Sequence, residues 1–109
     1  MSVQHRELAG GRWQAFTLAE QMGNIGSEIS RAAAWQGRDE KLFHGAITRA
    51  LELLDITIQD PRWRDRLKEL TRTREIICDT SVGSTTYGVS LQELDNYFYP
   101  FAFLARRDR

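Results

Sequence analysis

Apolar residues recur every three or four positions along four separate stretches of this chain, and this spacing constrains the fold more than any other feature. In the first stretch the apolar positions are Leu18, Met22, Ile25, Ile29 and Ala32. Side chains at such spacings lie on one face of an α-helix, which has about 3.6 residues per turn. Similar stripes follow within residues 39–58, 61–79 and 90–107. The sequence therefore predicts four amphipathic helices and an all-α fold.

Short connections between the first three helices favour antiparallel neighbours, so we expect an antiparallel four-helix bundle. The chain has 109 residues, the usual size of one domain. We expect residues 13–109 to form this domain and residues 1–12 to be a flexible leader. Gly10 and Gly11 would interrupt a helix there, and Trp13 is the first large apolar side chain able to dock on a core. The stripes also place further leucines on or beside the core faces, namely Leu42, Leu67 and Leu104.

Capping residues stand at the predicted start of each helix. Thr17 and Glu20 have the spacing of a capping box, in which each side chain accepts a hydrogen bond from the other residue's amide. The other predicted N-caps are Asp39, Asp60 (followed by Pro61) and Ser90 (paired with Glu93). Gly37 suits the end of the first helix, where a left-handed conformation is needed.

Two interruptions are expected in the second half of the chain. The third helix should end before a loop rich in Gly, Ser and Thr at residues 80–90. Pro100 removes one hydrogen bond from the last helix, because proline has no amide hydrogen. We therefore expect this helix to be kinked or broken near residues 96–100.

The charge balance and the cysteine count limit the class of protein. The 15 basic and 15 acidic residues give a net charge of zero, and no apolar run approaches the length of a membrane span. The single cysteine, Cys78, excludes an intramolecular disulfide and a cysteine-based zinc site, and we expect it to be a buried structural thiol. A soluble, cytoplasmic protein without membrane contact is the simplest interpretation.

A second stripe on the first helix consists entirely of small residues: Ala19, Gly23, Gly26, Ser30 and Ala33. Glycine inside a helix costs about 1 kcal/mol relative to alanine, so its use needs a physical reason. Close approach of another helix is one reason, either inside the bundle or across a dimer interface. Space for a ligand is the other. We favour packing and take these residues as a candidate interface.

Residues that carry catalysis or hold cofactors are few. The chain has no Walker A motif and no dinucleotide-binding fingerprint, and Gly23-Asn-Ile-Gly26 lies within a helical pattern rather than after a strand. Glu40 and His44 are four residues apart, but no second Glu/His pair completes a di-iron site. We therefore expect no cofactor and no metal, and an enzymatic role is not favoured.

One short segment nevertheless has a catalytic counterpart. Arg38-Asp-Glu-Lys-Leu-Phe-His44 resembles the Arg…His motif of HEPN-type ribonucleases, small helical bundles that commonly form dimers. The resemblance implies that His44 would act as acid or base on an RNA 2′-hydroxyl, and that Arg38 would hold the phosphate. The other interpretation, which we prefer, is that Arg38 is a loop residue and His44 lies on the polar side of its helix.

A basic face is predicted on the third helix, where Arg64, Lys68 and Arg72 follow one another at intervals of four. Together with Trp63 and the aromatic residues from Tyr97 to Phe103, which Arg106 and Arg107 follow, it could bind single-stranded nucleic acid. An ordinary solvated helix face, with those aromatic residues in the core, is the simpler interpretation.

Three segments resemble a family of small, uncharacterised bacterial proteins. They are Leu18-Ala-Glu-Gln-Met-Gly-Asn-Ile-Gly-Ser-Glu-Ile-Ser-Arg31, Arg49-Ala-Leu-Glu-Leu-Leu-Asp55 and Tyr97-Phe-Tyr99. The resemblance covers most of residues 13–106 and implies a bacterial, cytoplasmic protein, without an activity or site residues. The leading hypothesis is a non-enzymatic bundle that acts by self-association, as a homo-oligomer, or by binding a protein or RNA partner. The alternatives are a HEPN-like ribonuclease of toxin or defence type and a nucleic-acid-binding accessory protein.

Overall fold

Four α-helices make up most of residues 12–83 and 87–107, the part of the chain that this computed structural model describes. They are α1 (Leu18–Trp35), α2 (Glu40–Ile58), α3 (Leu67–Ser81) and α4 (Leu91–Arg107). Two short 3-10 helices, η2 (Trp13–Ala15) and η3 (Pro61–Arg66), precede α1 and α3. The predicted all-α fold is confirmed. The predicted leader lies, except for Arg12, outside the described residues.

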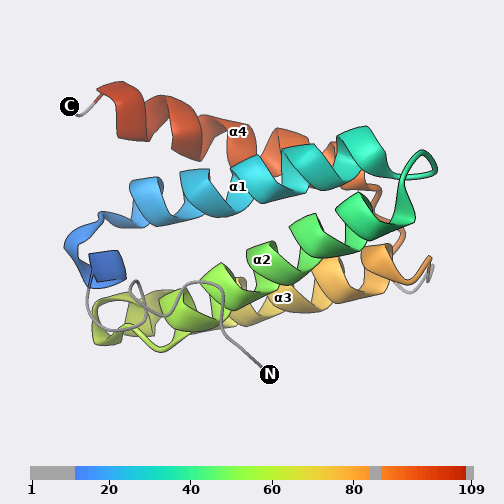
Figure 1. Cartoon of the computed structure of the whole chain (residues 1–109). Helices are drawn as coiled ribbons and strands as arrows, with labels where there is room; N and C mark the ends of the chain where they lie inside the picture. Colours follow the sequence, from blue (N-terminus) through green and yellow to red (C-terminus); the bar gives the residue numbers. More distant parts are fainter. Residues whose placement is uncertain (1–11, 84–86, 108–109) are drawn as a thin grey trace.

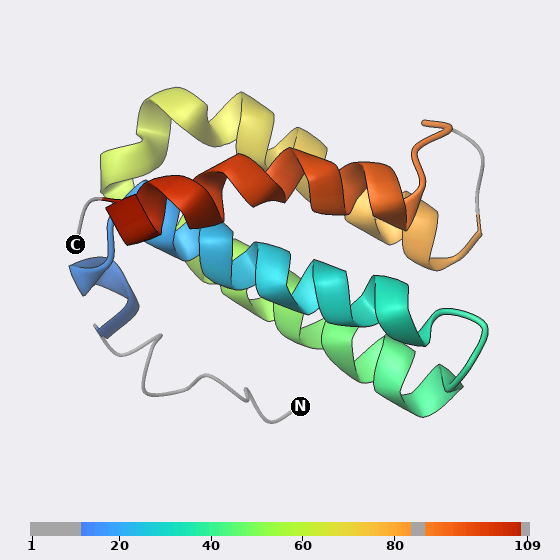
Figure 2. The ribbon, with the colours of Figure 1, turned by 90° about the horizontal axis from the view of Figure 1, so that it is seen from above.

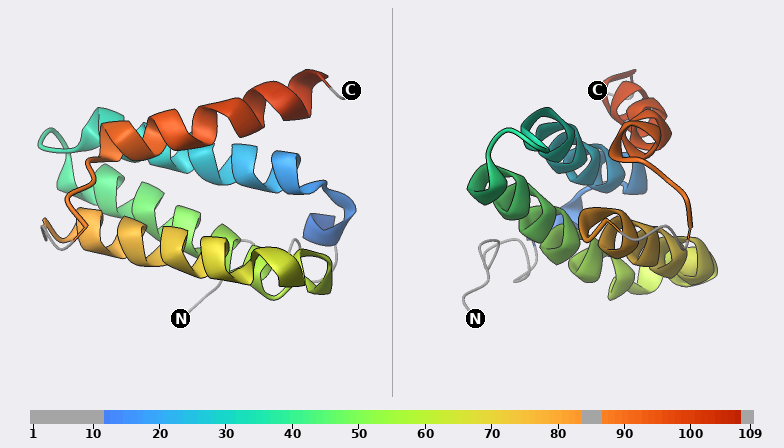
Figure 3. Two further views of the ribbon diagram at one scale, coloured as in Figure 1. Left: turned by 180° about the vertical axis from the view of Figure 1, so that it is seen from behind. Right: turned by 90° about the vertical axis from the view of Figure 1, so that its right-hand side faces the viewer.

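Successive helices run in opposite directions and form a four-helix bundle. α1 and α4 lie side by side on one side of the molecule, and α2 and α3 lie on the other (Figure 1). The end-on view in Figure 3 shows one helix at each corner. α1 packs extensively on both α2 and α4, whereas α3 makes few contacts with α4. The view from above also shows α4 running along α1 (Figure 2). None of the described helices is long and apolar enough to cross a membrane.

The predicted helix starts are confirmed by their hydrogen bonds. The Thr17 hydroxyl accepts from the Glu20 amide at 3.1 Å, and the Glu20 carboxylate accepts from the Thr17 amide at 2.9 Å. Ser90 and Glu93 make the same pair of bonds at the start of α4. The remaining predicted N-caps, Asp39 and Asp60, accept from the amides of Leu42 and Arg62. Gly37, between α1 and α2, has the expected positive φ of 75°.

The core lies between the four helices and is closed at one end by η2. Trp13 is 1% exposed, so this segment docks on the bundle as predicted. Three leucines expected on or beside the core faces, Leu42, Leu67 and Leu104, are exposed instead. Each lies within four residues of an end of its helix, where neighbouring helices cover less of the surface.

Hydrogen bonds between buried polar groups hold η2 and η3 to the bundle. The Trp13 indole donates to the Thr57 hydroxyl of α2 at 2.9 Å. The side-chain amide of Gln21 in α1 donates to the Trp13 backbone carbonyl at 2.9 Å. The Trp63 indole of η3 donates to the Gln21 side-chain oxygen at 2.8 Å. Buried polar groups are tolerated only when paired, so these bonds define how the segments meet.

The second half of the chain differs from the prediction in two respects. The expected single third helix is divided: residues 61–66 are wound as the 3-10 helix η3, within which Trp63 has non-helical backbone angles (φ −102°, ψ 21°), and Arg66 has φ −107° and ψ 5° where α3 begins. α3 extends to Ser81, so the following loop is shorter than predicted. Of the kink and the break expected near Pro100, the break is excluded, because α4 continues through this residue.

Candidate functional site

The small-residue stripe of α1 faces α4 of the same chain at two positions. A Cβ atom added to Gly26 would lie 2.6 Å from the Phe98 Cβ, and one added to Gly23 would lie 3.2 Å from the Ala102 Cα. The distance at Gly26 leaves no room for a side chain, and the distance at Gly23 is shorter than an ordinary van der Waals contact, so both glycines serve close helix packing within the bundle. Ala19 and Ala33 are half-buried, and Ser30 is exposed.

Beside this contact, two shallow hollows follow the seam between α1 and α4, with volumes of about 180 and 150 Å³. Both are lined by Gly23, Ser27, Ala102 and Arg106. The larger also includes Asp95 and Tyr99. We call this surface the α1/α4 groove. Its floor is made of small residues because the two helices approach so closely there.

Two large aromatic side chains are exposed on α4: Tyr99, which lines the groove, and Phe103, which does not line either hollow. Tyr99 is 66% exposed and Phe103 is 53% exposed. They are four positions apart, so they are neighbours on the helix surface. Clustered exposed aromatic groups are uncommon on a protein that binds nothing, because they leave apolar area in contact with water. The aromatic residues of this helix are predicted to lie in its core, but of Tyr97, Phe98 and Tyr99 only Phe98 is buried.

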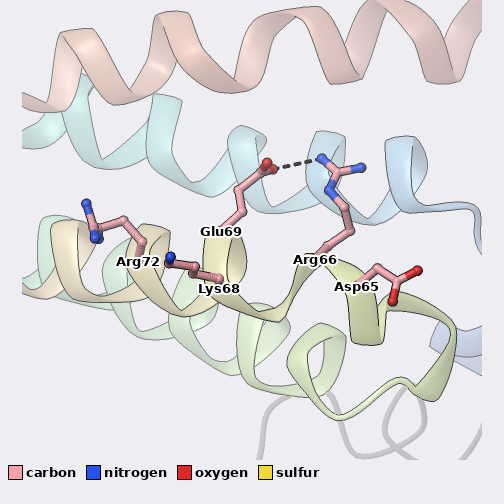
Figure 4. Close-up of a pocket in the computed structure, with 5 residues that line it drawn as sticks. All are labelled: Asp65, Arg66, Lys68, Glu69 and Arg72. Carbon is pink, nitrogen blue, oxygen red and sulfur yellow. Dashed lines mark hydrogen bonds and ion pairs between the residues drawn. The ribbon is translucent and has the colours of Figure 1, made fainter.

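The predicted basic face of the third helix is only partly assembled. Lys68 and Arg72 line an open hollow of about 440 Å³ on α3, with Arg66, Glu69 and Asp65 (Figure 4). Arg66 donates to Glu69 at 2.8 Å, so this pair is neutralised. Within the described residues, no ion pair involves Lys68 or Arg72. Arg64 belongs to η3 and does not line the hollow.

A separate apolar depression of about 280 Å³ lies between α3 and α4, which make few contacts with each other. Tyr97 lines it and donates a hydrogen bond across the helices to Glu69 at 3.1 Å. Burial is the main cause that raises the pKa of the Tyr97 phenol. Sequence reasoning missed this Tyr97–Glu69 contact because the two residues are 28 positions apart.

The two residues of the ribonuclease-like segment have separate contacts. The Arg38 guanidinium lies 5.6 Å from the Trp35 ring and donates to the Ala34 carbonyl at 3.4 Å. His44, in the first turns of α2, is exposed and lies 3.1 Å from Glu40. No hydrogen bond or ion pair of the described chain joins Arg38 to His44.

Cys78 is half-buried, not fully buried as predicted. The Arg74 guanidinium donates to its sulfur at 3.6 Å and also pairs with Asp55 of α2, at 2.7 Å. The hydrogen bond to Asp55 is the main cause that raises the pKa of Arg74.

Among the described residues, no three His, Cys, Asp or Glu side chains are grouped so that they could hold a metal ion. Comparison of the chain with protein-family models, curated proteins and solved structures gives no match. The candidate site therefore depends on the geometry alone, and the α1/α4 groove, together with the exposed aromatic side chains of α4, is the most distinct surface feature.

Proposed function

We propose that this protein acts by association, as a helical-bundle module that binds another protein chain through the α1/α4 groove. The exposure of Tyr99 and Phe103 on α4 carries this proposal. Burying such side chains against a partner stabilises a complex by about 25 cal/mol for each Å² of apolar surface removed from water. Aromatic side chains of this kind commonly dominate the binding energy of protein interfaces.

The shape of the groove supports the same function. Its small-residue floor lets a partner helix come close to α1 and α4, as small residues do between packed helices. The rim carries charged groups of both signs, Asp95 and Arg106, which suit the polar border of an interface.

The experiment is a comparison of purified wild-type protein with the variants Tyr99→Ser and Phe103→Ser. Molecular mass in solution and capture of partners from host lysate are measured together, with and without nuclease. The matched control is Leu42→Ser, which removes an exposed apolar side chain from α2. We expect complexes that survive nuclease and are weakened by the two α4 variants alone. A wild-type protein that is monomeric and captures no protein would contradict the proposal.

A second candidate function is binding of RNA through α3, and one observation favours it. Lys68 and Arg72 project from an open hollow without an acidic partner among the described residues (Figure 4). Unpaired cations release counterions from a phosphate backbone, so binding should weaken steeply with salt. Charge reversal at Lys68 and Arg72 should abolish binding of a labelled single-stranded RNA. RNA cleavage lost in His44→Ala would instead favour the ribonuclease hypothesis.

A further inference from the structure

We infer that the partner in the α1/α4 groove is a second copy of this chain, bound through an antiparallel pairing of the two α4 helices about a twofold axis. This inference rests on the proposed function and names its partner. It comes from four of the α4 residues that line the groove, namely Asp95, Tyr99, Ala102 and Arg106; the other two are the buried Phe98 and the half-buried Ala105.

The spacing of these four residues is the same in both directions along the helix. The intervals are four, three and four residues, so the set forms a single stripe on α4. In a twofold contact each residue meets its counterpart in reverse order, because both copies offer the same surface. An axis between positions 100 and 101 brings Asp95 opposite Arg106 of the second copy, and Tyr99 opposite Ala102 of the second copy.

The charges match in this register. Asp95 and Arg106 have opposite signs and lie at the two ends of the stripe. Neither forms an ion pair within the part of the chain that the structure describes. The twofold axis generates two Asp–Arg pairs, one at each end of the contact. A parallel pairing would instead place like charges together, so the charges also select the direction.

The side-chain sizes match as well. Tyr99 is exposed and is opposed by the small side chain of Ala102 of the second copy, which lies at a hollow of about 180 Å³. An apolar cavity of about 150 Å³ accommodates a benzene ring, so the hollow is large enough for the ring of the opposing Tyr99. Ser27 and Ser30 of α1 border the same hollow and are small enough to leave it open. Each copy thus supplies both an aromatic ring and a hollow that receives one.

The overall charge does not oppose the pairing. The chain carries 15 basic and 15 acidic residues, so two copies do not repel one another at long range. Many acidic or basic proteins could offer a charge opposite to that at one end of the stripe. A second copy matches both ends and both central positions at once, and this is why we commit to it.

The test uses charge reversal in the full chain, with the dimer dissociation constant measured by sedimentation equilibrium at low salt. Asp95→Arg and Arg106→Asp each turn two attractive pairs into two repulsive ones, and we expect each to weaken the dimer by about tenfold. Combining both substitutions in one chain restores opposite charges, and the dimer should return to near wild-type strength. Lys41→Asp is the control, because it changes the net charge as Arg106→Asp does but on exposed α2 surface.

Mixing the two single variants gives a decisive result. Asp95→Arg chains carry two basic side chains on the stripe, and Arg106→Asp chains carry two acidic ones. An equimolar mixture should therefore form heterodimers more tightly than either variant forms homodimers. Recovery on mixing can occur only if both variants are folded. It therefore excludes misfolding as the cause of the weaker homodimers.

The possible outcomes separate this inference from the proposed function. Weakening by the single variants, together with recovery on mixing, supports the twofold pairing. A dimer that is insensitive to both reversals overturns the pairing but leaves association in place. A monomeric wild type that captures a different protein, with capture reduced by Tyr99→Ser, overturns the second copy as partner and retains the groove as a binding surface. A monomer that captures nothing overturns both.

Discussion

At the scale of single residues, two glycines inside helices should respond to substitution by alanine in opposite ways. Gly26 faces Phe98 so closely that a Cβ atom would lie 2.6 Å from the Phe98 Cβ, whereas at Gly45 it would meet only the end of the Arg49 side chain, at 3.4 Å. We expect Gly26→Ala to lower the free energy of unfolding by about 1–3 kcal/mol through overpacking. Gly45→Ala should raise it by up to about 1 kcal/mol, because alanine favours the helix.

Chemical denaturation of both variants measures these changes. If Gly26→Ala were as stable as Gly45→Ala, α1 and α4 would not pack as closely as the structure shows. The sequence pattern marked Gly23 and Gly26 as a contact for another helix, but it did not show which helix. That information depends on the position of α4, which is far from α1 in the sequence.

Asp60 is a residue whose ionisation should affect stability. It is buried, and its hydrogen bonds with Arg62 hold its pKa below the ordinary value of 3.8. The folded protein therefore favours the charged form, so the stabilisation is complete above about pH 4 and is lost as the pH falls through the lower folded pKa. We expect Asp60→Asn to lower the free energy of unfolding at pH 7 by about 2 kcal/mol.

The difference in unfolding free energy between wild type and Asp60→Asn should shrink as the pH falls toward 3, and urea denaturation at several pH values measures it. The control is Asp65→Asn, an exposed residue of η3, for which we expect little change. A difference that stays constant across the acid range would show that the charge of Asp60 does not contribute.

At the scale of secondary-structure elements, Pro100 lies inside α4 at a cost that the rest of the helix offsets. Proline in a helix interior is about 3 kcal/mol less favourable than alanine. Because Pro100 is exposed, no core contact is lost when it is replaced. We expect Pro100→Ala to raise the free energy of unfolding by about 1–3 kcal/mol, as measured by thermal and urea denaturation.

Pro61→Ala is the matched control, because Pro61 occupies the first turn of η3, where an amide hydrogen has no helical partner. That variant should not gain stability. Equal gains for the two substitutions would mean that loss of the Pro100 hydrogen bond is not the cause.

Local sequence signals predicted where the elements begin more accurately than how they continue. The capping boxes at Thr17 and Ser90 involve residues three positions apart, so the sequence alone reveals them. The interruption of helical backbone at Trp63, inside η3, coincides with a long-range contact instead. The Trp63 indole reaches Gln21, 42 positions away, and this bond accompanies the non-helical backbone of Trp63. No periodicity within residues 61–79 contains that information.

At the scale of the whole molecule, the same limit explains what could be predicted of the candidate site. The four apolar stripes were sufficient for the bundle, since each must be buried against another helix. The α1/α4 groove required knowing that Tyr99 and Ala102 lie beside Ser27, a contact between the two ends of the chain. The basic face was predicted as a single row, and the structure divides it because Arg64 belongs to a separate 3-10 helix.

The unequal packing of the helices makes a final prediction about stability within the native state. α1 packs on both α2 and α4, whereas α3 contacts α2 and makes few contacts with α4. Segments with fewer packed neighbours open at lower free energy than the rest of a protein. We therefore expect backbone amides in the middle of α3 to exchange with deuterium at least tenfold faster than those in the middle of α1, a difference of about 1.4 kcal/mol in opening free energy.

Hydrogen exchange measured by NMR resolves the individual amides and tests this directly. Thr73 and Ile77 of α3 are suitable probes, with Ile25 and Ile29 of α1 for comparison, because all four are buried in the static structure. Burial alone would predict equal protection, so only the difference in packing distinguishes the two helices. Equal exchange at these positions would mean that the bundle opens as one cooperative unit, and that the depression between α3 and α4 does not mark a weaker side.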